Sequence, residues 1–150
     1  MGGVLPSPAA GGLRFLVEAT ADPGTEQHPG NPLQQIQIIK GWVDDAGTPQ
    51  QTVITVAGNL NAGSVDTQTC QTDGAGRARL CTVWEDPDWD PAVASFYYAR
   101  VLETPTCRWS TRQCNQFSQD TRPAGCDGTH IEQTVQQRAW SSPIWVEPEN

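Results

Sequence analysis

The sequence predicts an all-β protein, an antiparallel β-sandwich of about six or seven short strands with long loops. Several segments alternate apolar and polar residues with a period of two, the pattern of a strand with one buried face. Fourteen glycines and twelve prolines divide the chain into short pieces. Six tryptophans, two tyrosines and three phenylalanines supply the apolar surface that a folded core needs.

The N-terminal half of the chain predicts three strands. Residues 1–12 are rich in glycine, proline and alanine, and we expect a linker or an extended arm there. Residues 13–19 place alternate apolar side chains on one face, as a half-buried strand does. Residues 35–43 form the next strand, with a bulge expected near residues 40–41, where the alternation slips. Residues 51–57 are rich in β-branched side chains and return as the second strand of a hairpin.

The C-terminal half predicts the remaining strands. Residues 80–84 form one strand, and residues 95–102 give the strongest strand signal because aromatic and β-branched residues are concentrated there. A short helical turn is expected over residues 131–137. Residues 139–146 form the last strand, interrupted at Pro143. Proline donates no backbone hydrogen bond, so this strand is expected at a sheet edge or a bulge.

Chain length limits the number of domains. A chain of 150 residues and 16.3 kDa buries about two thirds of its surface on folding, which suffices for one sizeable core and not for two. Residues 13–150 are therefore expected to form a single β-sandwich domain. No apolar run approaches the roughly 20 residues of a membrane helix, so we expect no membrane insertion.

The charge balance argues against nucleic acid as a partner. The chain has 9 basic and 17 acidic residues, a net charge of −8. Proteins that bind nucleic acids use a basic surface to displace counterions from phosphates. The acidic excess also disfavours attraction to an anionic membrane surface.

Five cysteines indicate disulfide bonds: Cys70, Cys81, Cys107, Cys114 and Cys126. They contain no C-x-x-C spacing, so the usual zinc-ribbon pattern fails. The first two flank a turn-forming stretch that could bring them face to face, and the last three could supply a second bridge. One thiol stays free or pairs elsewhere, and the pairing stays open. Disulfides favour a periplasmic or secreted protein.

The sequence lacks the usual catalytic motifs. Its two histidines, His28 and His130, stand in neither H-x-H nor H-E-x-x-H. No G-x-S-x-G elbow and no complete dinucleotide fingerprint occurs. We therefore expect no catalytic residue and no cofactor in this chain.

An acidic loop is the best candidate for a metal site. Asp86, Asp88 and Asp90 have the spacing of the first three ligands of a calcium loop. The pattern then fails, because Pro91 occupies the glycine position and Tyr97 stands in place of the closing glutamate. The alternative is a solvated turn whose carboxylates accept hydrogen bonds from local backbone N–H groups.

The tryptophans raise the question of carbohydrate binding. Trp89 and Trp109 fall in expected loops and are the better candidates for a platform on which sugar rings stack. The other four lie in expected strands and are more simply explained as packing: Trp42, Trp84, Trp140 and Trp145.

Most arginines come late in the chain: Arg100, Arg108, Arg112, Arg122 and Arg138. Arginine buries its charge best in paired contacts with carboxylates, and Glu85, Asp86 and Glu103 are the expected partners. The alternative is contact with an anionic ligand or substrate.

Four stretches resemble a known bacterial family: NPLQQIQIIKGWVD at 31–44, LCTVWEDPDWDP at 80–91, FYYARVLETPTCRWS at 96–110 and QRAWSSPIW at 137–145. They are similar to the C-terminal part of an exported family of unknown function that is related to the polymerase-and-histidinol-phosphatase (PHP) metallohydrolases. The resemblance spans most of the chain, and the third and fourth stretches are its most specific parts.

The resemblance implies that this chain is the C-terminal fragment of a larger exported protein, with Met1 not a natural start. Its partner would be an upstream catalytic domain, which would hold the divalent metal; no metal ligand of that domain matches a position here. The chain would pack on that domain and help to shape its cleft. Arg100, Arg108, Trp109 and Arg138 are the residues expected to contribute.

A second hypothesis is a stand-alone exported module that binds a glycan or a protein partner.

If the chain is a fragment, as the first hypothesis holds, it should expose an apolar patch where the missing domain was. A chain expressed alone could form a homodimer through that patch.

Overall fold

The computed structural model describes residues 2–8, 11–127 and 131–148, which are mostly β-structure. They form ten strands: β1 (Gly3–Pro6), β2 (Arg14–Thr20), β3 (Leu33–Val43), β4 (Pro49–Gly58), β5 (Arg79–Glu85), β6 (Ser95–Glu103), β7 (Thr106–Cys107), β8 (Thr134–Val135), β9 (Arg138–Trp140) and β10 (Ile144–Glu147). One short helix, α1 (Trp109–Cys114), and one 3₁₀ turn, η1 (Ala124–Cys126), complete the described elements.

The main sheet is mixed, which corrects the expected all-antiparallel arrangement of about six or seven strands. Its order is β1-β10-β6-β3-β4, and β9 also pairs with β6. The pair β1–β10 is parallel, and the other pairs are antiparallel. Residues 3–6, inside the expected arm, form β1 because the extended arm lies along β10, with the Ser7 amide donating to the Glu147 carbonyl. The remaining strands form two small sheets, β2–β5 and β7–β8.

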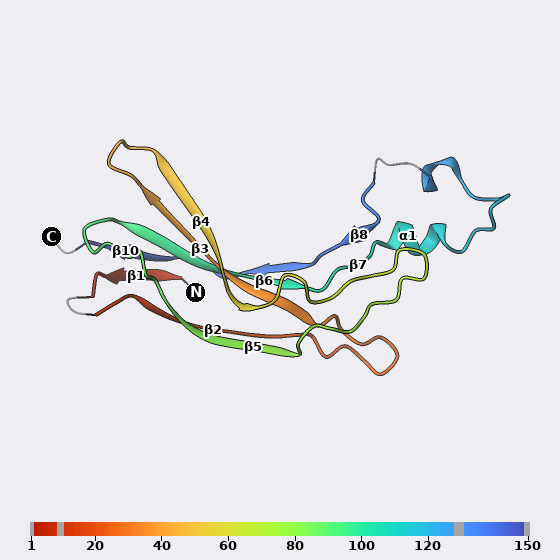
Figure 1. Cartoon of the computed structure of the whole chain (residues 1–150), viewed down its shortest axis with the longest axis horizontal. Helices are drawn as coiled ribbons and strands as arrows, with labels where there is room; N and C mark the ends of the chain where they lie inside the picture. Colours follow the sequence, from red (N-terminus) through yellow and green to blue (C-terminus); the bar gives the residue numbers. More distant parts are fainter. Residues whose placement is uncertain (1, 9–10, 128–130, 149–150) are drawn as a thin grey trace.

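The molecule is elongated, with both chain ends near one end and α1 near the other (Figure 1). The β3–β4 hairpin extends away from the neighbouring strands at the end that holds the chain termini (Figure 1). The bulge in this hairpin lies at Ile36–Gln37, because Ala57 and Thr55 are their partners and Val56 is the extra residue. The expected slip near Lys40–Gly41 is wrong, since both residues pair in regular register.

The β2–β5 pair packs on one face of the main sheet and encloses the core. Phe15 and Leu13 contribute from the N-terminal side, and Ile38, Tyr97 and Val146 from strands of the main sheet. The Phe15 and Tyr97 rings lie 4.7 Å apart, centroid to centroid. This contact explains the period-two pattern of residues 13–19, because each second side chain of β2 points to the main sheet.

The loop region at the α1 end contains both disulfides. Cys70 pairs with Cys107 and Cys114 with Cys126, whereas Cys81 is free and exposed. The expected second bridge among the last three cysteines is confirmed. The expected face-to-face pairing of Cys70 and Cys81 is wrong. Cys81 lies in β5 opposite Glu18, whereas Cys70 is bonded to Cys107 of β7.

The expected helical turn over residues 131–137 is also wrong. Thr134 and Val135 form β8 and pair with Cys107 and Thr106 of β7. The Thr111 hydroxyl donates to the Gln133 carbonyl at 2.7 Å and holds this segment extended. Pairing with β7 therefore overrides the weak local preference for a helix. The helix of this region is α1, where none was expected.

Candidate functional site

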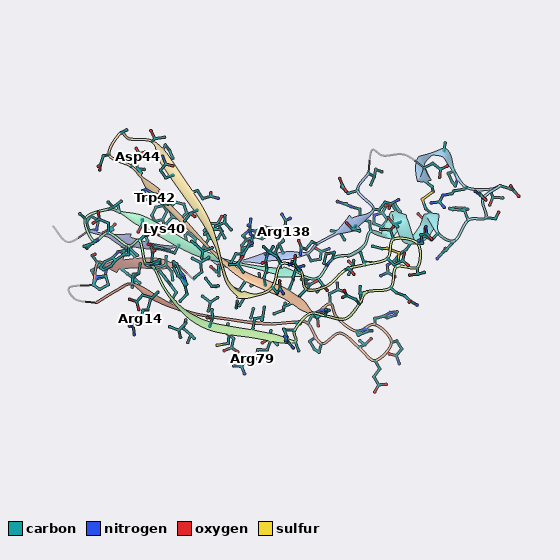
Figure 2. The ribbon with its side chains drawn as sticks, in the orientation of Figure 1. Arg14, Lys40, Trp42, Asp44, Arg79 and Arg138 are labelled. Carbon is teal, nitrogen blue, oxygen red and sulfur yellow. A yellow bond between two sulfur atoms is a disulfide. The ribbon has the colours of Figure 1, made fainter. Side chains whose placement is uncertain are left out.

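A well-defined concavity lies between the β3–β4 hairpin and the loop that joins β5 to β6; we call it the hairpin cleft. Its volume is about 570 Å³. Lining residues include Lys40, Trp42, Asp45, Trp84, Asp86 and Asp88. Figure 2 shows Lys40, Trp42 and Asp44 following one another along this hairpin. An open cleft with two indole walls and a few polar groups is the common form of a small-molecule binding site.

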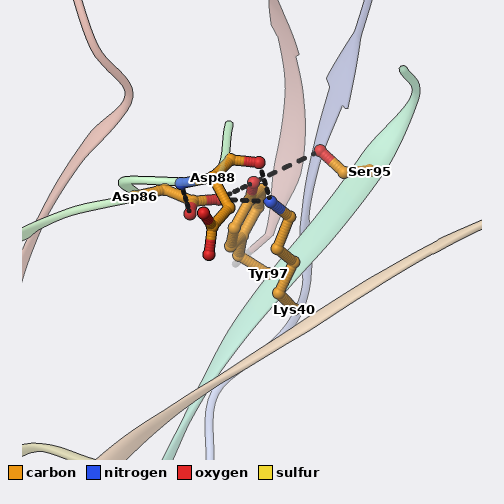
Figure 3. A network of polar contacts seen from close by, with 5 residues as sticks. All are labelled: Lys40, Asp86, Asp88, Ser95 and Tyr97. Carbon is orange, nitrogen blue, oxygen red and sulfur yellow. Dashed lines mark hydrogen bonds and ion pairs between the residues drawn. The ribbon is translucent and has the colours of Figure 1, made fainter. Parts of the chain in front are cut away.

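A buried polar network ties the cleft together (Figure 3). The Lys40 ammonium lies 2.6 Å from Asp86 Oδ2 and donates to the Asp88 carbonyl at 2.8 Å. The Tyr97 hydroxyl donates to the same Asp86 oxygen at 2.7 Å, and the Asp88 amide donates to Asp86 Oδ1 at 3.0 Å. The side chains of Lys40 and Asp86 are only 10% and 3% exposed. The network therefore fixes the loop after β5 against β3.

Strand pairing explains how the network assembles. Lys40 and Tyr97 are direct partners across β3 and β6, and Asp86 follows the last residue of β5. The network also fixes the protonation state of Tyr97. Burial raises the pKa of the Tyr97 hydroxyl, and the Asp86 carboxylate raises it further. Tyr97 consequently stays protonated at neutral pH and remains a donor to Asp86. Because Asp86 is committed to these donors, the network holds structure and does not present a free base.

The carboxylate of Asp44 marks the hairpin turn at the rim of the cleft. It accepts hydrogen bonds from the Thr48 amide, the Gln50 side chain and the Ala46 amide. These bonds lower the pKa of Asp44 below its ordinary value of 3.8, the Thr48 bond most. Asp44 therefore carries its negative charge at neutral pH.

The turn at Asp44 is expected to weaken in acid. A lowered folded-state pKa gives stability that is present above the ordinary value of 3.8 and is lost as the pH falls through the lowered value. The free energy of unfolding should therefore fall below about pH 4, and less steeply in Asp44→Asn than in the native chain. Urea unfolding at several pH values measures this, with exposed Asp120→Asn as control. Equal pH dependence in Asp44→Asn and the native chain would refute it.

The cleft contains the predicted acidic loop, and two of its three carboxylates already have partners. Asp86 forms an ion pair with Lys40, and the Asp90 carboxylate accepts a hydrogen bond from the Ala92 amide at 2.9 Å. In the described part of the chain, no group of three His, Cys, Asp or Glu side chains is placed to hold a metal ion. Asp86 and Asp90 accept hydrogen bonds from local backbone N–H groups, as the alternative interpretation expected, but Asp86 is buried and not solvated.

The two predicted platform tryptophans lie apart. Trp89 is half-buried against the core, and its indole nitrogen has no partner among the described residues. Trp109 begins α1 at the other end of the molecule and is 75% exposed. Trp42 and Trp84, which were expected to pack, line the cleft. Trp84 also packs against the core as expected, with its ring stacked on Phe15 at a centroid distance of 6.1 Å.

The four residues expected to act together are also divided. Arg100 in β6 donates a hydrogen bond to the Gln37 side chain at 2.8 Å. Arg138 in β9 lies opposite Leu102 of β6 (Figure 2). Arg108 precedes α1 and donates to the Thr134 carbonyl, next to exposed Trp109. Arg100 therefore uses an amide partner in place of the expected carboxylates.

The importance of Lys40 could have been inferred from the sequence. It is the chain's single lysine and stands in an otherwise apolar run, between Ile39 and Gly41. A lone ammonium in a buried strand needs a carboxylate partner. Trp42 and Trp84 carry no such signal, because their place in the cleft depends on how the β3–β4 hairpin lies relative to β5.

A second surface lies on the outer side of β2–β5; we call it the ribbon face. Leu16 and Val83 are direct cross-strand partners and are 72% and 66% exposed. Ion pairs of 2.8 Å flank them, Arg14 with Glu85 and Arg79 with Glu18. Figure 2 shows Arg14 and Arg79 on the side away from the β3–β4 hairpin. The free thiol of Cys81 is exposed two residue pairs further along, opposite Glu18.

Comparison with known proteins gives one match. The profile of a family described as "Protein of unknown function (DUF3604)" matches residues 1–148. No curated protein and no solved structure matches the chain significantly.

Among the described residues, no helix is long and apolar enough to cross a membrane. The two disulfides are typical of an oxidising compartment outside the cytoplasm.

Proposed function

We propose a function from the premise that this chain belongs to the DUF3604 family, whose profile covers residues 1–148. The chain is the accessory C-terminal β domain of an exported, metal-dependent hydrolase related to the PHP enzymes. It packs on an upstream catalytic domain and helps to form that domain's cleft. The resemblance of the stretches at 96–110 and 137–145 supports the PHP relation, and it assigns the divalent metal to the catalytic domain.

The ribbon face is the observation that carries this proposal. Interfaces between proteins combine an apolar centre with a polar rim. Exposed Leu16 and Val83 form such a centre, and the Arg14–Glu85 and Arg79–Glu18 pairs form such a rim. In this proposal β2–β5 is the outer layer of a β-sandwich, with the core on one side and the catalytic domain on the other. In a chain expressed alone, a second copy would cover the same face.

The proposed location is the periplasm or the medium outside the cell. Disulfides persist where thiols are not kept reduced, and two bridges close loops near α1.

A second candidate function is a stand-alone exported module that binds a glycan or a protein partner. The hairpin cleft favours it, because Trp42 and Trp84 line a concavity of about 570 Å³.

Substitutions on the ribbon face test the accessory role. Leu16→Asp with Val83→Lys should leave the melting temperature of the 150-residue chain nearly unchanged at a dilution where it is a monomer, because both side chains then face solvent and the two new charges are opposite. In the full-length product of the natural gene, the pair should split one calorimetric transition into two, since the domains no longer dock. Leu60→Asp, on an exposed loop residue, is the matched control. A full-length protein that melts identically with and without the pair would reject docking through this face.

A further inference from the structure

The hairpin cleft has a one-sided charge. The charged residues that line it are five aspartates and one lysine: Asp44, Asp45, Asp86, Asp88, Asp90 and Lys40. Lys40 is committed to Asp86 at 2.6 Å, so these two charges cancel within the buried network. The other four carboxylates remain uncompensated by any lining residue. Their combined field in a concave, partly apolar site attracts a cation and repels an anion.

The carboxylates are available to a ligand to different degrees. The Asp44 carboxylate already accepts a hydrogen bond from the Thr48 amide of the turn, and the Asp90 carboxylate accepts one from the Ala92 amide. Asp45 and Asp88 are exposed, and they line the cleft from two different elements, Asp45 from the hairpin turn and Asp88 from the loop after β5. A group that donates several hydrogen bonds to these two side chains would satisfy both.

The indoles of the cleft suit the apolar part of such a ligand. Trp42 and Trp84 contribute one ring each, from β3 and from β5. The Lys40 ammonium already lies 5.4 Å from the centroid of the Trp42 ring, within the range of a cation–π contact. Trp42 thus stands in a setting where a positive charge is accepted close to the ring.

From these three features we infer that the hairpin cleft binds a small organic cation, an ammonium group carried on an apolar body. The ammonium lies between the Asp45 and Asp88 carboxylates, and the body packs against Trp42 and Trp84. A neutral sugar would use the indoles but not the charge, and a bare metal ion would use the charge but not the indoles. This inference does not depend on docking through the ribbon face, so each can fail alone.

Two ligands of equal shape separate the contribution of charge. Benzylamine and benzyl alcohol are titrated into the ¹⁵N-labelled 150-residue chain, and the indole N–H signals are followed by NMR. Signals of Trp42 and Trp84 should move with benzylamine, and that of Trp109 should not. Benzylamine should bind at least about tenfold more tightly than benzyl alcohol. Raising sodium chloride to about 0.5 M should weaken its binding several-fold.

Paired variants locate the charge. Asp45→Asn with Asp88→Asn should weaken benzylamine binding about tenfold while preserving the fold, because both residues are exposed. Asp120→Asn, an exposed carboxylate outside the cleft, should leave binding unchanged. Equal affinity for the two ligands, or no movement of the cleft indoles with either, overturns the inference. Tighter binding of cellobiose or calcium chloride in the same cleft overturns it in favour of a sugar or a metal site.

Discussion

The Lys40→Met variant is expected to lose about 3–5 kcal/mol of unfolding free energy, because the buried Asp86 carboxylate then lacks its cation. The ammonium is 2.6 Å from Asp86 Oδ2, and the two side chains are 10% and 3% exposed. The remaining donors to Asp86, the Tyr97 hydroxyl and the Asp88 amide, are neutral and do not cancel its charge. Urea unfolding followed by tryptophan fluorescence measures the loss.

A double variant separates the charge effect from lost packing. Asp86→Asn in the Lys40→Met background removes the unpaired charge, keeps an acceptor for Tyr97 and should restore part of the lost stability. If Lys40→Met costs less than about 1 kcal/mol, the pair behaves as an exposed ion pair and the buried network is not what holds the loop.

Removing the Cys70–Cys107 bridge, by alanine at both positions, should cost about 4 kcal/mol. The bridged residues are 37 positions apart, and a disulfide restricts the unfolded chain more as the loop it closes lengthens. Chemical unfolding of the double variant and the native chain under non-reducing conditions gives the difference.

The Cys114–Cys126 bridge provides the comparison, because it spans only 12 positions. Alanine at both of these positions should cost about 3 kcal/mol, less than loss of the longer loop. The reverse order would show that the Cys70–Cys107 bridge contributes little to restricting the unfolded chain.

Local patterns predicted most of the strands. Residues 13–19, 51–57 and 95–102 correspond to β2, β4 and β6, since alternation and β-branched or aromatic content report directly on a pleated surface. The interruption at Pro143 likewise separates β9 from β10. These features depend on neighbours in the sequence, so a single sequence reveals them.

Features set by distant partners were missed. Residues 3–6 carry a glycine- and proline-rich pattern and become β1 only because β10 offers an edge. Cys70 lies 11 positions from Cys81 but bonds to Cys107, because the loop crosses to β7. The cleft lies between the β3–β4 hairpin and the loop after β5. No pattern of neighbouring residues in the sequence therefore indicates that Trp42 and Trp84 line it.

The coding DNA immediately upstream of the Met1 codon tests the accessory role most directly. The proposal predicts an open reading frame that continues upstream into histidine-rich metal-binding motifs and, before them, a signal peptide. A stop codon and a ribosome-binding site just before Met1 would contradict it. That result would make the chain a free-standing protein and favour the binding module.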